Sequence, residues 1–183
     1  MDVFDDQVIH DRIADYRERD PFVLVEDDRL ATLPEAFRDE SYVWKDVEWV
    51  VRWYCRRPLT HTQRPAEEAF RTNSMHDVRS ALRAAVESTD LTAQLESLTD
   101  LAGVDIRIAS AFLHFLDPDQ YVAIDDHAWN TLVAAGVLSD PYPVPPSATA
   151  YATFLDQCRR IAAQTDVRVV DVGRALWADA RDA

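Results

Sequence analysis

Two adjacent aspartates, Asp125 and Asp126, are the residues of this sequence best placed to do chemistry. They follow the extended apolar segment YVAI and precede His127 and Trp129 in a stretch with helical composition. A carboxylate that opens a helix within a cleft can activate a water or stabilise a developing positive charge. The same carboxylate can also be only the N-cap of the helix, accepting hydrogen bonds from its free amides. The two roles are compatible, because one position serves both.

A very short turn between two predicted helices precedes these aspartates. The turn reads LAGVD, residues 101–105, and its Gly103 permits backbone angles and close approaches that a side chain would prevent. Asp105 then opens the predicted helix IRIASAFLHFL. Because a helix N-terminus presents free amides, such a hairpin suits an anion such as phosphate. Most helical hairpins serve packing alone, so the turn by itself leaves both roles open.

The order of these elements resembles the helix-hairpin-helix DNA glycosylases, the superfamily of endonuclease III and the 8-oxoguanine glycosylases. LAGVD is similar to the family hairpin L-P-G-V-G, and IDDHAW, residues 124–129, is similar to the segment V-D-x-H-x-W that holds the catalytic aspartate. The resemblance covers residues 91–135 well, and it extends weakly to the upstream helices and to the C-terminal DVGRALW. It implies an all-α, two-lobed helical bundle of the helix-hairpin-helix DNA glycosylase type.

The resemblance also implies a reaction, the hydrolytic removal of a DNA base that is first flipped out of the duplex into a pocket. Asp125 would be the catalytic carboxylate. The candidates for lining the base pocket are His127, Trp129 and Trp53. The candidates for contact with double-stranded DNA in the hairpin are Gly103, Val104, Asp105 and Arg107. The candidates for binding phosphate, at the end of a predicted helix, are Arg52, Arg56 and Arg57, which can equally complement the helix dipole and pair with carboxylates.

Two hairpin positions depart from the family pattern. Bifunctional members carry a lysine that forms a Schiff base, and the corresponding residue here is Arg107, which stays protonated. We therefore expect a monofunctional enzyme without lyase activity. Asp105 replaces the second hairpin glycine, and its carboxylate would face a phosphate if the hairpin docked on DNA. The alternative is a non-catalytic helix-hairpin-helix module that binds DNA or a protein, in which Asp105 caps its own helix.

The charge of the chain bears on its partners and its environment. The 183 residues include 33 acidic and 19 basic ones, which gives a net charge of −14, and Lys45 is the only lysine. An excess of aspartate combined with a lack of lysine predicts a halophilic protein, kept soluble in molar salt. In ordinary salt this charge would disfavour nucleic acid as a partner, since phosphate contacts need a basic footprint. In molar salt, local arginines and backbone amides could still bind DNA.

Other sequence signals exclude several kinds of site. Cys55 and Cys158 lie far apart, and the five histidines show no metal-ligand spacing, so we expect no disulfide framework, no metal and no cofactor. No signal-peptide pattern and no bilayer-spanning apolar run is found, so we expect a cytoplasmic protein without a membrane partner. The sequence does not indicate an oligomeric state.

Glycine scarcity favours helices, because sheet-rich folds need glycine in hairpins and bulges and this chain has 3. We expect about eight helices in one domain, residues 1–183. Its lobes would be residues 1–70 with 147–183, and residues 74–136. The predicted N-caps include Ser41, Ser74, and Asp90 or Thr92. Residues 21–34 are predicted to be a connector with a brief strand at most, and residues 58–73 a polar crossing.

Overall fold

The computed structural model describes residues 4–56 and 64–179, and this part of the chain is all-α, as predicted. It contains ten helices and, within the described residues, no strand. The helices are α1 Asp6–Arg19, α2 Val23–Asp39, α3 Trp44–Arg56, α4 Arg64–Phe70, α5 Met75–Glu87, α6 Leu91–Thr99, α7 Ile106–Leu116, α8 Asp126–Ala134, α9 Ala148–Thr165 and α10 Val169–Asp179. No helix among the described residues combines the length and apolar character needed to cross a membrane.

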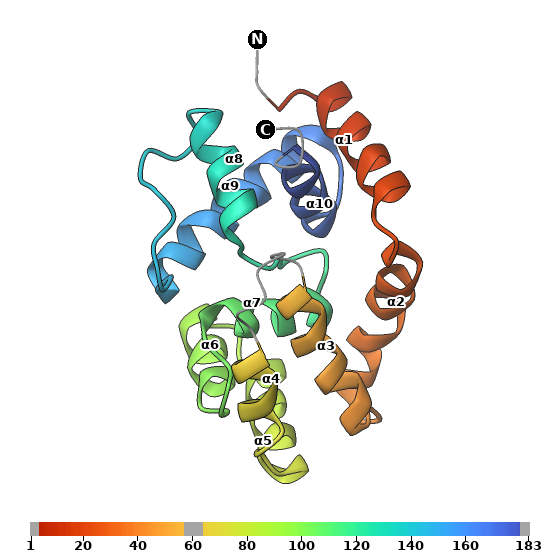
Figure 1. Ribbon diagram of the computed structural model, residues 1–183, viewed down its shortest axis with the longest axis vertical. Coiled ribbons are helices and arrows are strands. Elements are labelled where there is room, and N and C mark those ends of the chain that lie inside the picture. The colour runs from red at the N-terminus through yellow and green to blue at the C-terminus, as the bar shows by residue number, and fades with distance from the viewer. Residues whose placement is uncertain (1–3, 57–63, 180–183) are drawn as a thin grey trace.

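The helices gather toward two ends of an elongated molecule (Figure 1). α8, α9 and α10 lie together at one end, where α1 packs along α10, and α4, α5 and α6 lie at the other. α7 and the link to α8 lie between the two ends, and α3 and α2 both pack against α7. The division into lobes of residues 1–70 with 147–183 and of residues 74–136 remains a prediction. The arrangement nevertheless puts the predicted catalytic aspartate, at the start of α8, near the middle of the fold.

α2 occupies residues predicted to be mostly a connector, and this prediction is wrong. The helix buries one face at alternating spacings of three and four residues, made of Val23, Glu26, Leu30, Leu33 and Phe37. Glu26 hides this pattern in the sequence, because a carboxylate interrupts the apolar series. Pro34 hides it further, since it lies inside the helix, where proline normally ends one.

The start of α3 also differs from the prediction, because Ser41 does not cap it. The helix begins at Trp44, and the carboxylate of Asp46 in its first turn accepts the N–H of Val43 at 2.9 Å. Val43 therefore precedes the helix and is 56% exposed. A carboxylate reaching back from the first turn replaces the serine cap.

Local capping signals elsewhere are confirmed. The Ser74 hydroxyl accepts the N–H of Asp77 at 3.1 Å, and the Asp77 carboxylate accepts the N–H of Ser74, which makes a capping box at the start of α5. Asp90, rather than Thr92, caps α6 by accepting the N–H of Ala93 at 2.8 Å. The predicted polar crossing contains the short helix α4, whose position matters for the hairpin described below.

Candidate functional site

The 121–125 segment, which joins α7 to α8, is extended and forms no strand pairing within the described residues. Its buried backbone groups are instead satisfied by side chains from three helices. Two tyrosines donate to its carbonyl groups: Tyr151 of α9 to Val122 O at 3.1 Å, and Tyr54 of α3 to Ile124 O at 2.7 Å. Two side chains of α7 accept its N–H groups: His114 Nδ1 that of Ala123 at 3.3 Å, and Ser110 Oγ that of Ile124 at 3.0 Å. Without these partners the segment would carry unsatisfied groups in the core. The segment that ends at Asp125 is thus fixed by α3, α7 and α9.

The two α7 side chains that hold this segment had a signal in the sequence. Ser110 and His114 are four residues apart in an otherwise apolar helix, so they share one helix face. Both are buried, with exposed fractions of 0% and 1%. A polar pair on a buried helix face indicates that groups able to hydrogen-bond pack against that face. Here these groups belong to the segment that leads to Asp125.

Asp125 is the N-cap of α8, and its carboxylate is buried. Its Oδ1 accepts the N–H of Ala128 at 2.8 Å, and 1% of the residue is exposed. Six described helices have a side-chain N-cap, and the other five capping residues, Asp5, Ser74, Asp90, Asp105 and Ser147, are exposed or half-buried. Burying a carboxylate costs free energy that an exposed cap avoids. Capping alone therefore does not account for the burial of Asp125.

Two tyrosines lie within electrostatic range of Asp125. Burial raises the pKa of Tyr54 well above its ordinary value, and the charge of Asp125 adds to the rise. Burial likewise raises the pKa of Tyr142, in the loop between α8 and α9. Arg107 opposes this rise, whereas Asp125 and Asp126 add to it. The structure thus brings together Asp125, Arg107 and Tyr142, of which the sequence had predicted the first two.

The α8–α9 loop is attached to α8 through Trp129. Trp129 Nε1 donates to Asp140 O at 2.9 Å, and its ring meets the ring of Tyr142 edge-on at 5.9 Å. The other described aromatic neighbour of Trp129 is Phe154 of α9, stacked at 6.3 Å. Trp129, predicted to line a base pocket, is 4% exposed and packed among these groups. In this conformation its ring is part of the hydrophobic core and holds the α8–α9 loop against α8.

In the hairpin between α6 and α7, the charged side chains of Asp105 and Arg107 interact with each other and with the start of α7. The carboxylate of Asp105 caps α7 by accepting the N–H groups of Arg107 at 3.0 Å and Ile108 at 3.1 Å. The guanidinium of Arg107 folds back onto the same carboxylate, with Nε donating to Oδ2 at 2.7 Å. Asp105 thus compensates the charge of Arg107 within two residues of sequence. Any DNA contact by Arg107 would compete with this ion pair.

The turn of the hairpin faces α4 and the residues that follow it. Gly103 has φ +78°, and a Cβ there would lie 2.3 Å from Ala66 O and 2.7 Å from Phe70 N. The side chain of Asn73 both donates to Ala102 O at 3.0 Å and accepts the N–H of Ala102 at 2.9 Å. Val104, also predicted to contact DNA, is 7% exposed. The glycine therefore permits the approach of α4, a packing role that the sequence did not reveal.

The remaining predicted site residues lie apart from Asp125 or outside the described part. Trp53 donates from Nε1 to Glu26 Oε2 at 2.9 Å, so the structure places it in a different polar cluster. Arg52 is 3.7 Å from Glu67 Oε2 of α4, as expected for an arginine that pairs with a carboxylate. His127 is half-buried in the first turn of α8. Arg57 and the side chain of Arg56 lie outside the described residues.

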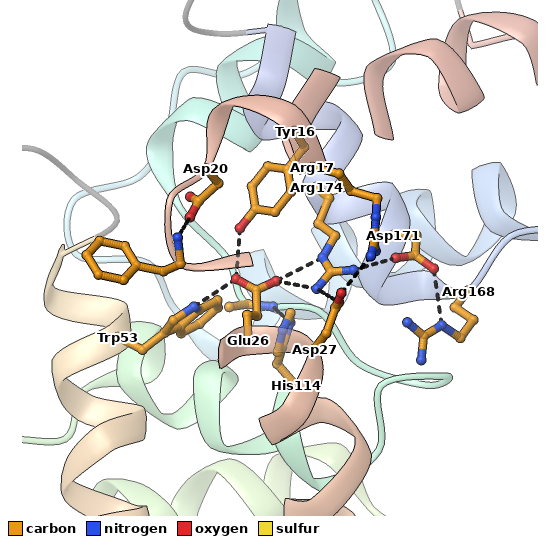
Figure 2. A network of polar contacts seen from close by, with 12 residues as sticks. Tyr16, Arg17, Asp20, Glu26, Asp27, Trp53, His114, Arg168, Asp171 and Arg174 are labelled. Carbon is orange, nitrogen blue, oxygen red and sulfur yellow. Dashed lines mark hydrogen bonds and ion pairs between the residues drawn. The ribbon is translucent and has the colours of Figure 1, made fainter. Parts of the chain in front are cut away.

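The cluster that holds Trp53 is the most buried ionic group among the described residues, and the sequence did not predict it (Figure 2). Arg174 of α10 is 1% exposed, and its guanidinium is shared by carboxylates of α2 and α10: Glu26 at 2.8 Å, Asp27 at 2.7 Å and Asp171 at 3.1 Å. Tyr16 of α1 donates to Glu26 Oε2 at 2.8 Å. We call these residues, with Trp53, the Arg174 network.

The Arg174 network holds helices together through charged groups that stabilise one another. Burial opposes ionisation of Asp27, but hydrogen bonds and charge from Arg174 and then Arg17 hold the pKa of this carboxyl below its ordinary value. Burial opposes the protonated form of Arg174, yet Glu26 and the other carboxylates raise its pKa further above the ordinary value. Asp27 and Arg174 are thus both held in their charged forms by their partners. The network fixes α10 to α1, α2 and α3.

Neither the cysteines nor the acidic groups suggest a metal centre. Cys55 and Cys158 are both buried free thiols; burial raises the pKa of Cys55 to about 12 and that of Cys158 higher still. Within the described residues no group of three or more histidine, cysteine and carboxylate side chains is arranged to hold a metal ion.

Comparisons with models of known protein families, with curated proteins and with solved structures found no match.

Proposed function

We propose that this protein is a monofunctional DNA-base N-glycosylase of the helix-hairpin-helix type, with Asp125 as its catalytic carboxylate. The observation that carries the proposal is that side chains of three helices hold the segment that ends at Asp125. Such support positions the carboxylate more firmly than a helix cap requires. Catalytic groups need this kind of fixed geometry.

The proposed step is hydrolysis of the bond between a base and its deoxyribose. As that bond breaks, its electron pair leaves with the base, which takes up a proton, and positive charge develops on the sugar. The Asp125 carboxylate stabilises this charge and accepts a proton from the water whose oxygen bonds to the sugar carbon; it then releases this proton to solvent, from which the departing base takes up its own. In a buried site these interactions are stronger than in water. Arg107 forms no covalent intermediate, so the mechanism includes no lyase step.

A substrate reaches Asp125 only if a neighbouring segment moves, because the residue is 1% exposed. We propose that residues 139–146 of the α8–α9 loop move. In the described part of the chain a single hydrogen bond, from Trp129 to Asp140, holds these residues. Tyr142 of this loop is within electrostatic range of Asp125, and Val144 beside it is 83% exposed. Loops that close over a site commonly exclude water in this way.

The test is base release from duplex DNA carrying a panel of damaged bases, in molar KCl, under single-turnover conditions. Asp125→Asn is the informative variant, since asparagine caps a helix as well as aspartate does but cannot stabilise charge in the same way. We expect the variant to fold and to release base at least ~100-fold more slowly. Asp90→Asn, at the exposed cap of α6, is the matched control and should keep full activity. Equal rates for the two variants would disprove the role of Asp125.

The second candidate is a non-catalytic module of the same fold, and the ion pair between Asp105 and Arg107 favours it. The hairpin turn, packed on α4, likewise has a structural use that needs no DNA. Fluorescence anisotropy with an undamaged duplex, at several KCl concentrations, separates the possibilities. Retention of DNA without release of any base would support a DNA-binding module. Neither retention nor release would leave protein interaction as the role of this fold.

A further inference from the structure

Tyr142 has a hydroxyl that no other described residue uses. The oxygen is fully buried, yet it has no hydrogen-bond partner among the residues that the structure describes. Buried polar atoms are nearly always paired, because leaving one without a partner costs free energy. A phenylalanine would fill the same space without this cost. The hydroxyl therefore calls for an explanation outside the packing of the loop.

In the conformation described, Trp129 connects Tyr142 to the first turn of α8. Trp129 lies one turn along α8 from Asp125, and its N–H donates to Asp125 O at 3.1 Å. The indole of Trp129 in turn holds Asp140 by a hydrogen bond and meets the ring of Tyr142 edge-on. The loop thus presents Tyr142 beside the N-terminus of α8. The charges of Asp125 and Asp126 both act on its hydroxyl, as does that of Arg107 from the hairpin.

The other donors identified around Asp125 are already engaged. Tyr54 donates to Ile124 O at 2.7 Å, and Arg107 donates to Asp105. Tyr142 is the tyrosine near Asp125 whose hydroxyl the described residues leave without an acceptor. Since burial raises its pKa, the hydroxyl keeps its proton at neutral pH and can donate a hydrogen bond to an incoming acceptor.

We propose that Tyr142 donates a hydrogen bond to the substrate base and thereby selects bases that present an acceptor toward the α8–α9 loop. This inference rests on the proposed glycosylase function. The acceptor is a carbonyl oxygen or an unprotonated ring nitrogen on the base edge, since the phenol supplies the proton. A site that hydrogen-bonds one substrate group discriminates strongly against analogues that lack this group.

Tyr42 provides a matched control. Its hydroxyl is also buried without a partner among the described residues, and burial raises its pKa to about 12. Its ring packs edge-on against Phe37 of α2 at 5.3 Å, and the charges acting on it come from Glu40, Arg79 and Arg83. The two tyrosines therefore share an unpartnered hydroxyl but differ in their surroundings. Of the two, only Tyr142 has Asp125 among the charges that act on its hydroxyl.

The experiment measures single-turnover base release by the full chain with Tyr142→Phe, Tyr42→Phe and Asp125→Asn, after thermal unfolding has been recorded for each. We expect Tyr142→Phe to unfold no earlier than the unmodified protein and to release base at least ~10-fold more slowly, as one lost hydrogen bond predicts. Tyr42→Phe should unfold similarly and react within ~2-fold of the unmodified rate. A Tyr142→Phe variant that unfolds much earlier would show a structural hydroxyl and overturn the proposal.

A second measurement separates recognition from other effects of the substitution. The released base is replaced by an analogue that lacks the acceptor atom, such as a 7-deazapurine for a purine. The analogue should slow the unmodified protein by the same factor as Tyr142→Phe, and it should slow the variant no further. Additive losses, or equal rates for the two phenylalanine variants, would overturn the role of Tyr142 while Asp125 could still be catalytic. If the unmodified protein releases no base, both the function and this inference fail.

Discussion

The guanidinium of Arg174 donates to Glu26 Oε1 at 2.8 Å, although 148 residues separate the two in sequence. Glu26 also accepts the indole N–H of Trp53, whose ring lies 4.9 Å from the ring of His114. His114 in turn accepts the N–H of Ala123, two residues before Asp125. A continuous set of contacts therefore connects the Arg174 network to the 121–125 segment, which positions Asp125.

Arg174→Met should destabilise the protein by about 3 to 5 kcal/mol, because it leaves buried carboxylates without their cation. The free energy of unfolding, measured by denaturant titration, tests this. Arg168→Met is the control, since Arg168 pairs with the same Asp171 at 3.1 Å but is 46% exposed. It should cost less than about 1 kcal/mol. Similar losses in the two variants would show that the Arg174 network adds little beyond a surface pair.

Acid should weaken the network through Asp27. Its pKa is held below 3.8 in the folded protein, so its contribution to stability is present above that value and is lost as the pH falls through the folded pKa. Unfolding measured from pH 7 to pH 2 should show Asp27→Asn less stable than the unmodified protein at neutral pH. The gap should narrow below about pH 3.8. Asp28→Asn, at an exposed neighbour in α2, should show no such convergence.

Ser110→Ala should cost about 1 to 3 kcal/mol, because it leaves the buried N–H of Ile124 without its acceptor. Ser97→Ala is the control, because both hydroxyls donate to the carbonyl three residues earlier: Ser110 to Arg107 O at 2.6 Å and Ser97 to Gln94 O at 2.9 Å. It should change stability by less than about 0.5 kcal/mol. Hydrogen exchange gives a local readout, in which the amide of Ile124 loses protection in Ser110→Ala. Unchanged protection there would contradict the proposed support of the segment.

Gly103→Ala and Gly136→Ala separate backbone strain from packing. Both glycines have positive φ, at +78° and +71°, so alanine is strained at either position by about 1 to 2 kcal/mol. The Gly103 Cβ would also meet the backbone of α4 at 2.3 Å, whereas that of Gly136 has nothing within 4 Å. Thermal unfolding should therefore show the larger loss for Gly103→Ala. Equal losses would mean that the approach of α4 does not require glycine.

Hydrogen bonds between residues close in sequence, such as helix caps, were predictable because both partners lie within one helical turn. The caps provided by Ser74, Asp90 and Asp105 depend on side chains that reach amides two or three residues away. The same reasoning placed Asp125 at the start of a helix and identified the all-α class. α2 was missed because Glu26 lies on its buried face, and a carboxylate at such a position is explained only by distant partners.

By itself the sequence determined the all-α class, several helix caps and the place of Asp125 at the start of a helix, since these follow from local periodicity and local hydrogen bonds. The tertiary structure decided which groups surround Asp125. Its burial, the approach of Tyr142 from the α8–α9 loop and the use of Gly103 by α4 all depend on packing between segments far apart in the chain. The physical reason is that desolvation and contact are properties of the assembled core, which no local pattern of residues encodes.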